Sequence, residues 1–196
     1  MNTKRRRESY LAWTERTVLN YLYKQYNLWY DFNQGNVLNI KEVNLNIRFT
    51  KEMYTDIYTR VGYEFAKETY KDLTGETLKE INFNLVTKET ISPFQLIINQ
   101  FIATELATRI TGVNTTSENV IRGLLVQAKK EGLGELETAK LLRSNFQEFS
   151  KVRSKTIART ELISSSNYGS LQGAKLTGLN LQKEWIASVG GSNDRL

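Results

Sequence analysis

Acidic side chains between residues 56 and 72 recur at the spacings of one helix face. Carboxylates so placed could hold a metal ion or work as an acid–base pair. Basic residues alternate with them, however, which is typical of the salt-bridged, solvent-facing side of a helix. The pattern therefore favours a structural role over a reactive site. The acids are Asp56, Glu64, Glu68 and Asp72, and the bases among them are Lys51, Arg60, Lys67 and Lys71.

Other reactive side chains are scarce. The chain of 196 residues contains no histidine and no cysteine, which excludes histidine bases, thiol nucleophiles and metal sites built from either residue. Gly132-Leu133-Gly134 lacks the preceding strand, the spacing and the lysine of a phosphate-binding loop. We expect no catalytic residue, no metal site and no cofactor, and hence a protein that is not an enzyme. A carboxylate-only enzyme, such as a nuclease, would need clustered acids that the sequence does not show.

The run Arg159-Thr160-Glu161 is a second candidate for chemistry, because it places a carboxylate next to a cation. It lies in a helix expected over about 152–175. Catalysis would require a second acid, a metal ligand or a histidine beside it, and the run contains none of these. We therefore expect Glu161 to pair with Arg153, with Arg159 or with a neighbouring helix.

The net charge of +6 is concentrated in two blocks. One is the N-terminal run Lys4, Arg5, Arg6 and Arg7. The other is 120–160, with nine basic and four acidic side chains. Polyanions such as nucleic acid are the natural partners of such blocks. The N-terminal run is our candidate for DNA or phosphate contact, and a solvated basic face is the alternative.

Two helices joined by glycines over 117–146 resemble a helix-turn-helix in outline. The second helix could present Lys140, Arg143, Ser144 and Asn145 to a DNA groove. Any two helices joined by glycines give this pattern, so it is only weak support for base reading.

Aromatic residues are frequent in the first expected helix and occur on more than one of its faces. Exposed aromatic surface is typical of a protein interface. The candidate interface residues are Tyr10, Trp13, Tyr21 and Trp29. The alternative is that another helix of the same chain covers them.

Hydrophobic periodicity predicts a mainly α-helical fold with five or six helices. The helix over 93–110 is apolar around most of its circumference, so we expect it to be the central one. Ser9 and Thr50 are expected N-caps. One or two short strands are expected near the C-terminus, within 179–188. The expected helices cover 9–32, 50–73, 93–110, 117–131, 135–146 and 152–175.

Three regions follow from these elements: a basic flexible tail over 1–8, an N-terminal helical region over 9–91 and a C-terminal domain over 92–196. No apolar run approaches the about 18 residues of a membrane span. The basic start is not followed by an apolar signal core. We therefore expect no membrane partner, and a protein that remains in the cell that makes it.

The C-terminal domain carries a more specific pattern. The stretches EGLGELETAKLLRSNF and RSKTIARTELISSSNYGSLQGAKLTGLNLQKEWIAS resemble the Mu F-like head morphogenesis family of tailed phages. The resemblance covers about 92–190, roughly half of the chain. It rests on Gly134, Leu142-Arg143, Ile157 to Glu161, Asn167-Tyr168-Gly169, Gly178, Lys183 and Trp185.

The resemblance implies a minor head protein, a structural part of the virion at the portal vertex, made in the host cytoplasm. It implies roles in head assembly and in DNA packaging or ejection, with the portal protein, further copies of the chain and non-specifically held packaged DNA as partners. Arg159, Thr160, Glu161 and Trp185 would be structural motif residues. Family members commonly continue beyond the segment that ends here at Leu196, so we expect a tail to be missing. The alternative is a DNA-binding accessory or regulatory protein.

Overall fold

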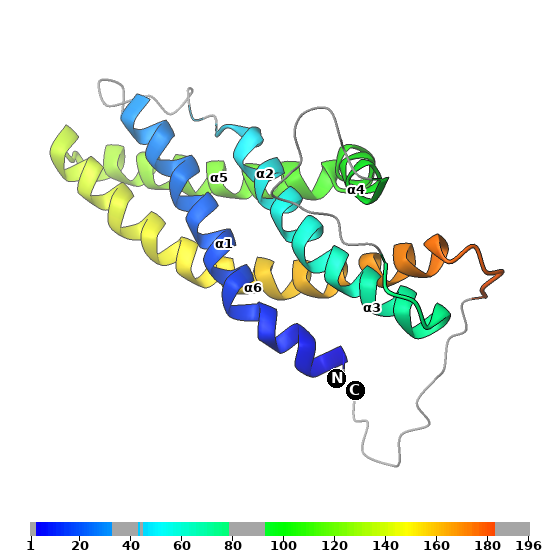
Figure 1. Ribbon diagram of the computed structural model, residues 1–196. Helices are drawn as coiled ribbons and strands as arrows, with labels where there is room; N and C mark the ends of the chain where they lie inside the picture. Colours follow the sequence, from blue (N-terminus) through cyan, green and yellow to red (C-terminus); the bar gives the residue numbers. More distant parts are fainter. Residues whose placement is uncertain (1–2, 33–42, 44, 79–92, 183–196) are drawn as a thin grey trace, which may run out of the picture.

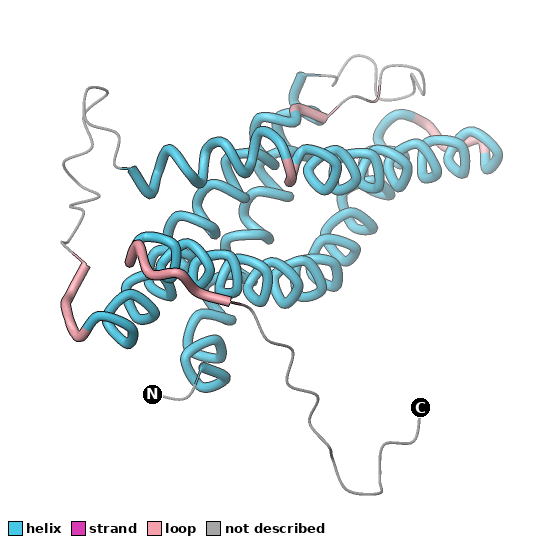
Figure 2. Tube along the Cα trace, turned by 90° about the vertical axis from the view of Figure 1, so that its right-hand side faces the viewer, coloured by secondary structure: helices cyan, strands magenta, loops and turns pink. Residues whose placement is uncertain are grey.

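Helices make up nearly all of the described protein. The computed structural model describes residues 3–32, 43, 45–78 and 93–182, and these ranges contain no strand (Figure 2). The mainly helical class is therefore confirmed. Of the predicted C-terminal strand, residues 179–182 are irregular and the remainder lies outside the described residues. The helices are α1 (Thr3–Phe32), α2 (Ile47–Ile57), the π-helical η3 (Tyr58–Gly62), α3 (Tyr63–Thr74), α4 (Pro93–Thr104), α5 (Ala107–Glu131) and α6 (Glu135–Leu176).

The centre of the fold is α6, which packs against α1, α2, η3, α3 and α5 (Figure 1). The predicted helices over 135–146 and 152–175 are joined in this single helix of 42 residues. No glycine or proline stands between them to end a helix, so the helix continues. The prediction that the helix over 93–110 is central was wrong: α4 ends at Thr104, and Leu96 within it is 54% exposed.

α1 packs against α6. Arg7 binds Ser166 at one end, and Tyr26 stacks on Phe146 at the other with ring centroids 4.3 Å apart, so the two helices run antiparallel. The buried side chains include Thr14, Val18, Leu22 and Tyr26 on α1, and Thr138, Leu142, Phe146, Ser150, Ser154, Ala158, Leu162 and Ser166 on α6.

A second face of α6 lies backbone to backbone against η3 and α3. A β-carbon built on Gly169 would stand 2.0 Å from the carbonyl oxygen of Gly62. One built on Gly173 would stand 2.3 Å from the carbonyl oxygen of Ala66. Gly169 and Gly173 are four residues apart on α6, as are Gly62 and Ala66 on the facing helix. These minimal side chains let the two backbones approach to direct contact.

Several helix ends differ from the sequence-based expectation. α1 begins at Thr3, so residues 3–8 of the predicted flexible tail form its first turns. The N-cap of α2 is Asn46, whose side chain accepts from the Arg48 amide at 2.9 Å, and not Thr50. α5 continues through Gly112, where a stop was predicted, because burial of the flanking Ile110 and Val113 outweighs the low helix propensity of glycine.

The predicted helix ends at 73, 131 and 175 lie within one residue of the observed ends of α3, α5 and α6. Gly75, Gly132 and Gly178 follow α3, α5 and α6, with φ of 74°, 66° and 69°. Only glycine enters this left-handed region without strain, which is why helices so often end at it.

Candidate functional site

The motif residue Glu161 is the centre of a buried polar cluster. Its side chain is 3% exposed. Tyr54 of α2 donates a hydrogen bond to one carboxylate oxygen at 3.1 Å, and Tyr58 of η3 donates to the other at 3.0 Å. Arg109 of α5 lies 3.5 Å from the second oxygen and also donates to Ser164 at 3.2 Å. One carboxylate thus fastens α2, η3 and α5 to α6.

Burial sets the protonation behaviour of this cluster. It raises the pKa of Glu161 above the ordinary value of 4.5, although hydrogen bonds from Tyr58 and Tyr54 and the charge of Arg109 act in the opposite direction. Burial, and then the neighbouring carboxylate, also raise the pKa of both tyrosines. The phenols therefore remain protonated donors, as a structural cluster requires.

The raised pKa of Glu161 predicts a pH dependence of stability. Between 4.5 and the raised pKa, the folded protein holds a proton that the unfolded chain has lost. The contribution of Glu161 is therefore fully present below pH 4.5 and is lost as pH rises through the folded-state pKa. Glu161→Gln mimics the neutral carboxyl group. Urea unfolding gives the free energy of unfolding of the wild type and of this variant at each pH. The wild-type value minus the variant value should fall as pH rises. A difference that stays constant or grows would contradict the assignment.

The two other motif residues lie away from this cluster. Arg159 and Thr160 are exposed, because neighbouring positions of a helix face different directions. Of the predicted alternatives for Glu161, pairing with a neighbouring helix is confirmed, since Arg109 of α5 is its cationic partner in place of Arg153 or Arg159. Arg153 instead donates to the Val113 carbonyl at 3.4 Å. Trp185 lies outside the described residues.

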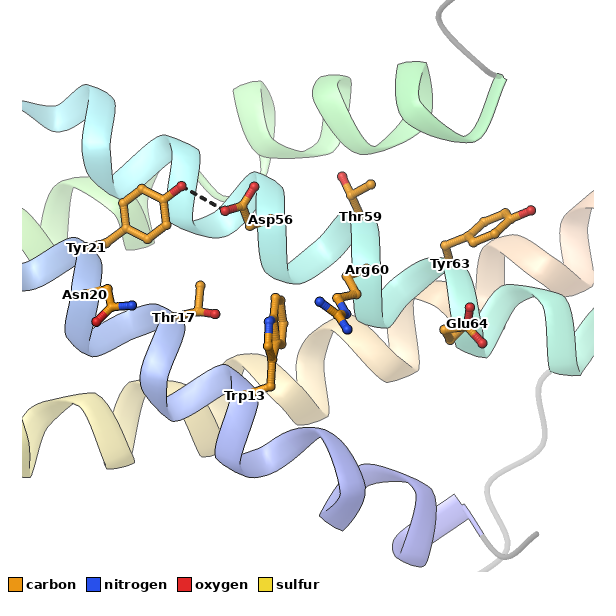
Figure 3. A pocket seen from close by; sticks show the side chains of 9 residues that line it. All are labelled: Trp13, Thr17, Asn20, Tyr21, Asp56, Thr59, Arg60, Tyr63 and Glu64. Carbon is orange, nitrogen blue, oxygen red and sulfur yellow. Dashed lines mark hydrogen bonds between the residues drawn. The ribbon is translucent and has the colours of Figure 1, made fainter. Parts of the chain in front are cut away.

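An open groove of about 680 Å³ separates α1 from the continuous helix formed by α2, η3 and α3 (Figure 3). The guanidinium carbon of Arg60 lies 4.6 Å from the ring centroid of Trp13, a cation–π contact. The Tyr21 hydroxyl donates to Asp56 at 2.8 Å. The lining residues are Trp13, Thr17, Asn20, Tyr21, Asp56, Thr59, Arg60, Tyr63 and Glu64.

The four candidate interface aromatics have different surroundings. Trp29 is 6% exposed and belongs to the core, so the same chain covers it. Tyr10, Trp13 and Tyr21 are half-buried against the main core, and the last two border the groove. Arg60 was not predicted as a groove residue, since its spacing placed it on a solvated, salt-bridged helix face.

The N-terminal basic run is largely occupied by contacts within the chain. Arg6 forms an ion pair with Glu68 of α3 at 2.6 Å. Arg7 donates to Ser166 at 2.6 Å and to Asn167, both on α6, and lies over the ring of Phe65. These two predicted phosphate contacts therefore hold α1 to its neighbours, whereas Lys4 and Arg5 are exposed.

Within the described ranges, no three acidic side chains are grouped so that they could hold a metal ion. No helix there is long and apolar enough to cross a membrane. Comparisons with protein-family models, with curated proteins and with solved structures find no match to this chain.

Proposed function

We propose that this chain is a structural minor head protein of a tailed phage, bound at the portal, which acts by assembly and not by catalysis. The observation that carries the proposal is the placement of the residues that resemble the head morphogenesis family. Several of them are residues on which the packing of α6 depends. A protein whose recognisable motif is used for packing is well suited to a role as an assembly part.

Five of the motif residues have distinct structural tasks, whereas Arg143, Arg159 and Thr160 are exposed. Leu142 and Ala158 are fully buried in the core. Glu161 joins three helices to α6. Gly169 allows the backbone contact with Gly62, and Gly178 ends α6. Their side chains contribute to packing and helix termination, which supports a structural signature in place of a reactive centre.

The groove between α1 and the α2–η3–α3 helix is the docking face that we propose for the portal protein. Tryptophan, tyrosine and arginine are the residue types that contribute most to binding energy at protein interfaces. Trp13, Tyr21 and Arg60 meet at this groove, and Arg60 is exposed. A second copy of the chain is the other candidate for this position.

Arg60→Glu should reduce the copy number of the chain in purified phage heads by roughly tenfold, because loss of one interface anchor costs more than about 1 kcal/mol. Lys51→Glu is the matched control. It makes the same charge change on an exposed position of α2 outside the groove. Quantitative mass spectrometry of particles measures the outcome, and thermal unfolding verifies that both variants fold. Full incorporation of Arg60→Glu would refute the docking face, and absence of the wild-type chain from heads would refute the proposed function.

A DNA-binding accessory or regulatory protein is the second candidate. The observation in its favour is the excess of basic residues over 120–160. Binding of the purified chain to a particular duplex sequence in preference to others would favour it over a head protein.

A further inference from the structure

Three exposed basic side chains lie close together on one side of α6. Lys151, Lys155 and Arg159 are all exposed and are four residues apart. Because α6 is one uninterrupted helix (Figure 1), in which each residue turns by about 100°, the three positions lie within about 80° of one another around the helix axis. This basic row is about 12 Å long, since an α-helix rises about 1.5 Å per residue.

The basic row is not neutralised by the protein itself. Among the described residues, none of its three cations forms an ion pair; the salt bridges found there involve other side chains. Glu148 is the one acidic residue of the sequence between Arg143 and Arg159. The exposed hydroxyls of Thr156 and Thr160 stand next to the row and offer further hydrogen-bond donors.

We propose that this basic row binds the sugar–phosphate backbone of double-stranded DNA without sequence preference. Duplex DNA carries about one negative charge per 1.7 Å of its axis, so three cations spread over about 12 Å can meet several phosphates. Cationic and hydroxyl side chains are the groups that contact phosphate oxygens in protein–DNA complexes. The proposal is independent of the proposed role in head assembly, because it concerns a property of the isolated chain.

The packing of α6 favours backbone contact over base reading. A recognition helix must enter the major groove of DNA with its bases exposed to it. α6 instead lies against α1 along one side and against α3 along another, so it can only lie across the phosphates. This differs from the helix-turn-helix hypothesis, which placed Lys140, Ser144 and Asn145 beside Arg143 at the bases.

The test compares two triple variants of the full chain with equal charge. K151Q/K155Q/R159Q removes three cations from the basic row. K51Q/K71Q/K175Q removes three exposed lysines from other positions. Binding to a short mixed-sequence duplex is followed by fluorescence anisotropy over a range of salt concentrations. Circular dichroism and thermal unfolding establish that both variants fold like the wild type.

We expect the row variant to bind more than tenfold more weakly. Its plot of log K against log salt should be shallower by roughly 2.7, since each lost phosphate contact removes about 0.9 from the slope. The control variant should retain most of the wild-type slope. Any one of four results would overturn the proposal. They are equal losses of DNA affinity in both variants, no binding by the wild type, strong preference for one duplex sequence, and tighter binding to anionic vesicles than to DNA.

Discussion

Gly169→Ala should lower the free energy of unfolding by about 2–4 kcal/mol, as overpacking of a closely packed contact does. The added β-carbon would lie 2.0 Å from the Gly62 carbonyl oxygen and 2.7 Å from its α-carbon. These are backbone atoms, so no side chain can rotate away. The helices would have to separate, and the adjoining contact of Gly173 with Ala66 would be lost as well.

Gly123→Ala is the matched control for this substitution. Gly123 also lies inside a helix, α5, but a β-carbon built on it meets nothing within 4 Å. Alanine there should raise stability by about 0.5–1 kcal/mol, since it forms helix better than glycine. Urea unfolding measures both variants, with unchanged m-values as the check on two-state behaviour. If Gly169→Ala were as stable as the wild type, the backbone contact between α6 and η3 could not exist.

Glu161→Ala should lower the free energy of unfolding by about 3–5 kcal/mol. Removing one partner of a buried charged cluster leaves the others without an acceptor while still excluded from water. The hydroxyls of Tyr54 and Tyr58 are both buried and both donate to this carboxylate. Thr160→Ala, at the neighbouring exposed position, should change stability by less than about 0.5 kcal/mol.

A triple variant tests whether the loss arises from the orphaned hydroxyls. In Glu161→Ala combined with Tyr54→Phe and Tyr58→Phe, no buried phenol is left without an acceptor. Its loss of stability should be smaller than the sum of the losses in the three single variants, because the residues act as a unit. Additive losses would mean that the three side chains stabilise the fold independently.

Both predictions concern one packing surface. Glu161, Ser165, Gly169 and Gly173 recur every four residues along α6, and all are buried. The facing row consists of Tyr54, Tyr58, Gly62 and Ala66, also four apart and buried. The large tyrosines meet the carboxylate at one end, and minimal residues meet minimal residues at the other. The two helices are therefore held apart by side chains at the polar cluster and approach to direct backbone contact at the other end.

Local features of the chain were readable from the sequence. The helical class followed from the recurrence of apolar residues such as Met53, Ile57 and Val61. The ends at Gly75, Gly132 and Gly178 followed from the conformational freedom of glycine. Such signals lie within a few residues of one another, so short-range sterics and burial of one helix face suffice to produce them.

The partners of Glu161 and the site of α6 in the fold were decided by tertiary packing. Tyr54 and Tyr58 are 107 and 103 positions away from Glu161, and Arg109 is 52 away. The rows that pack α6 contain serine and glycine, which carry no hydrophobic signal, and their spacing of four departs from the helical period of about 3.6. Whether such a row is buried depends on the helix that lies across it, and no local pattern in the sequence records that helix.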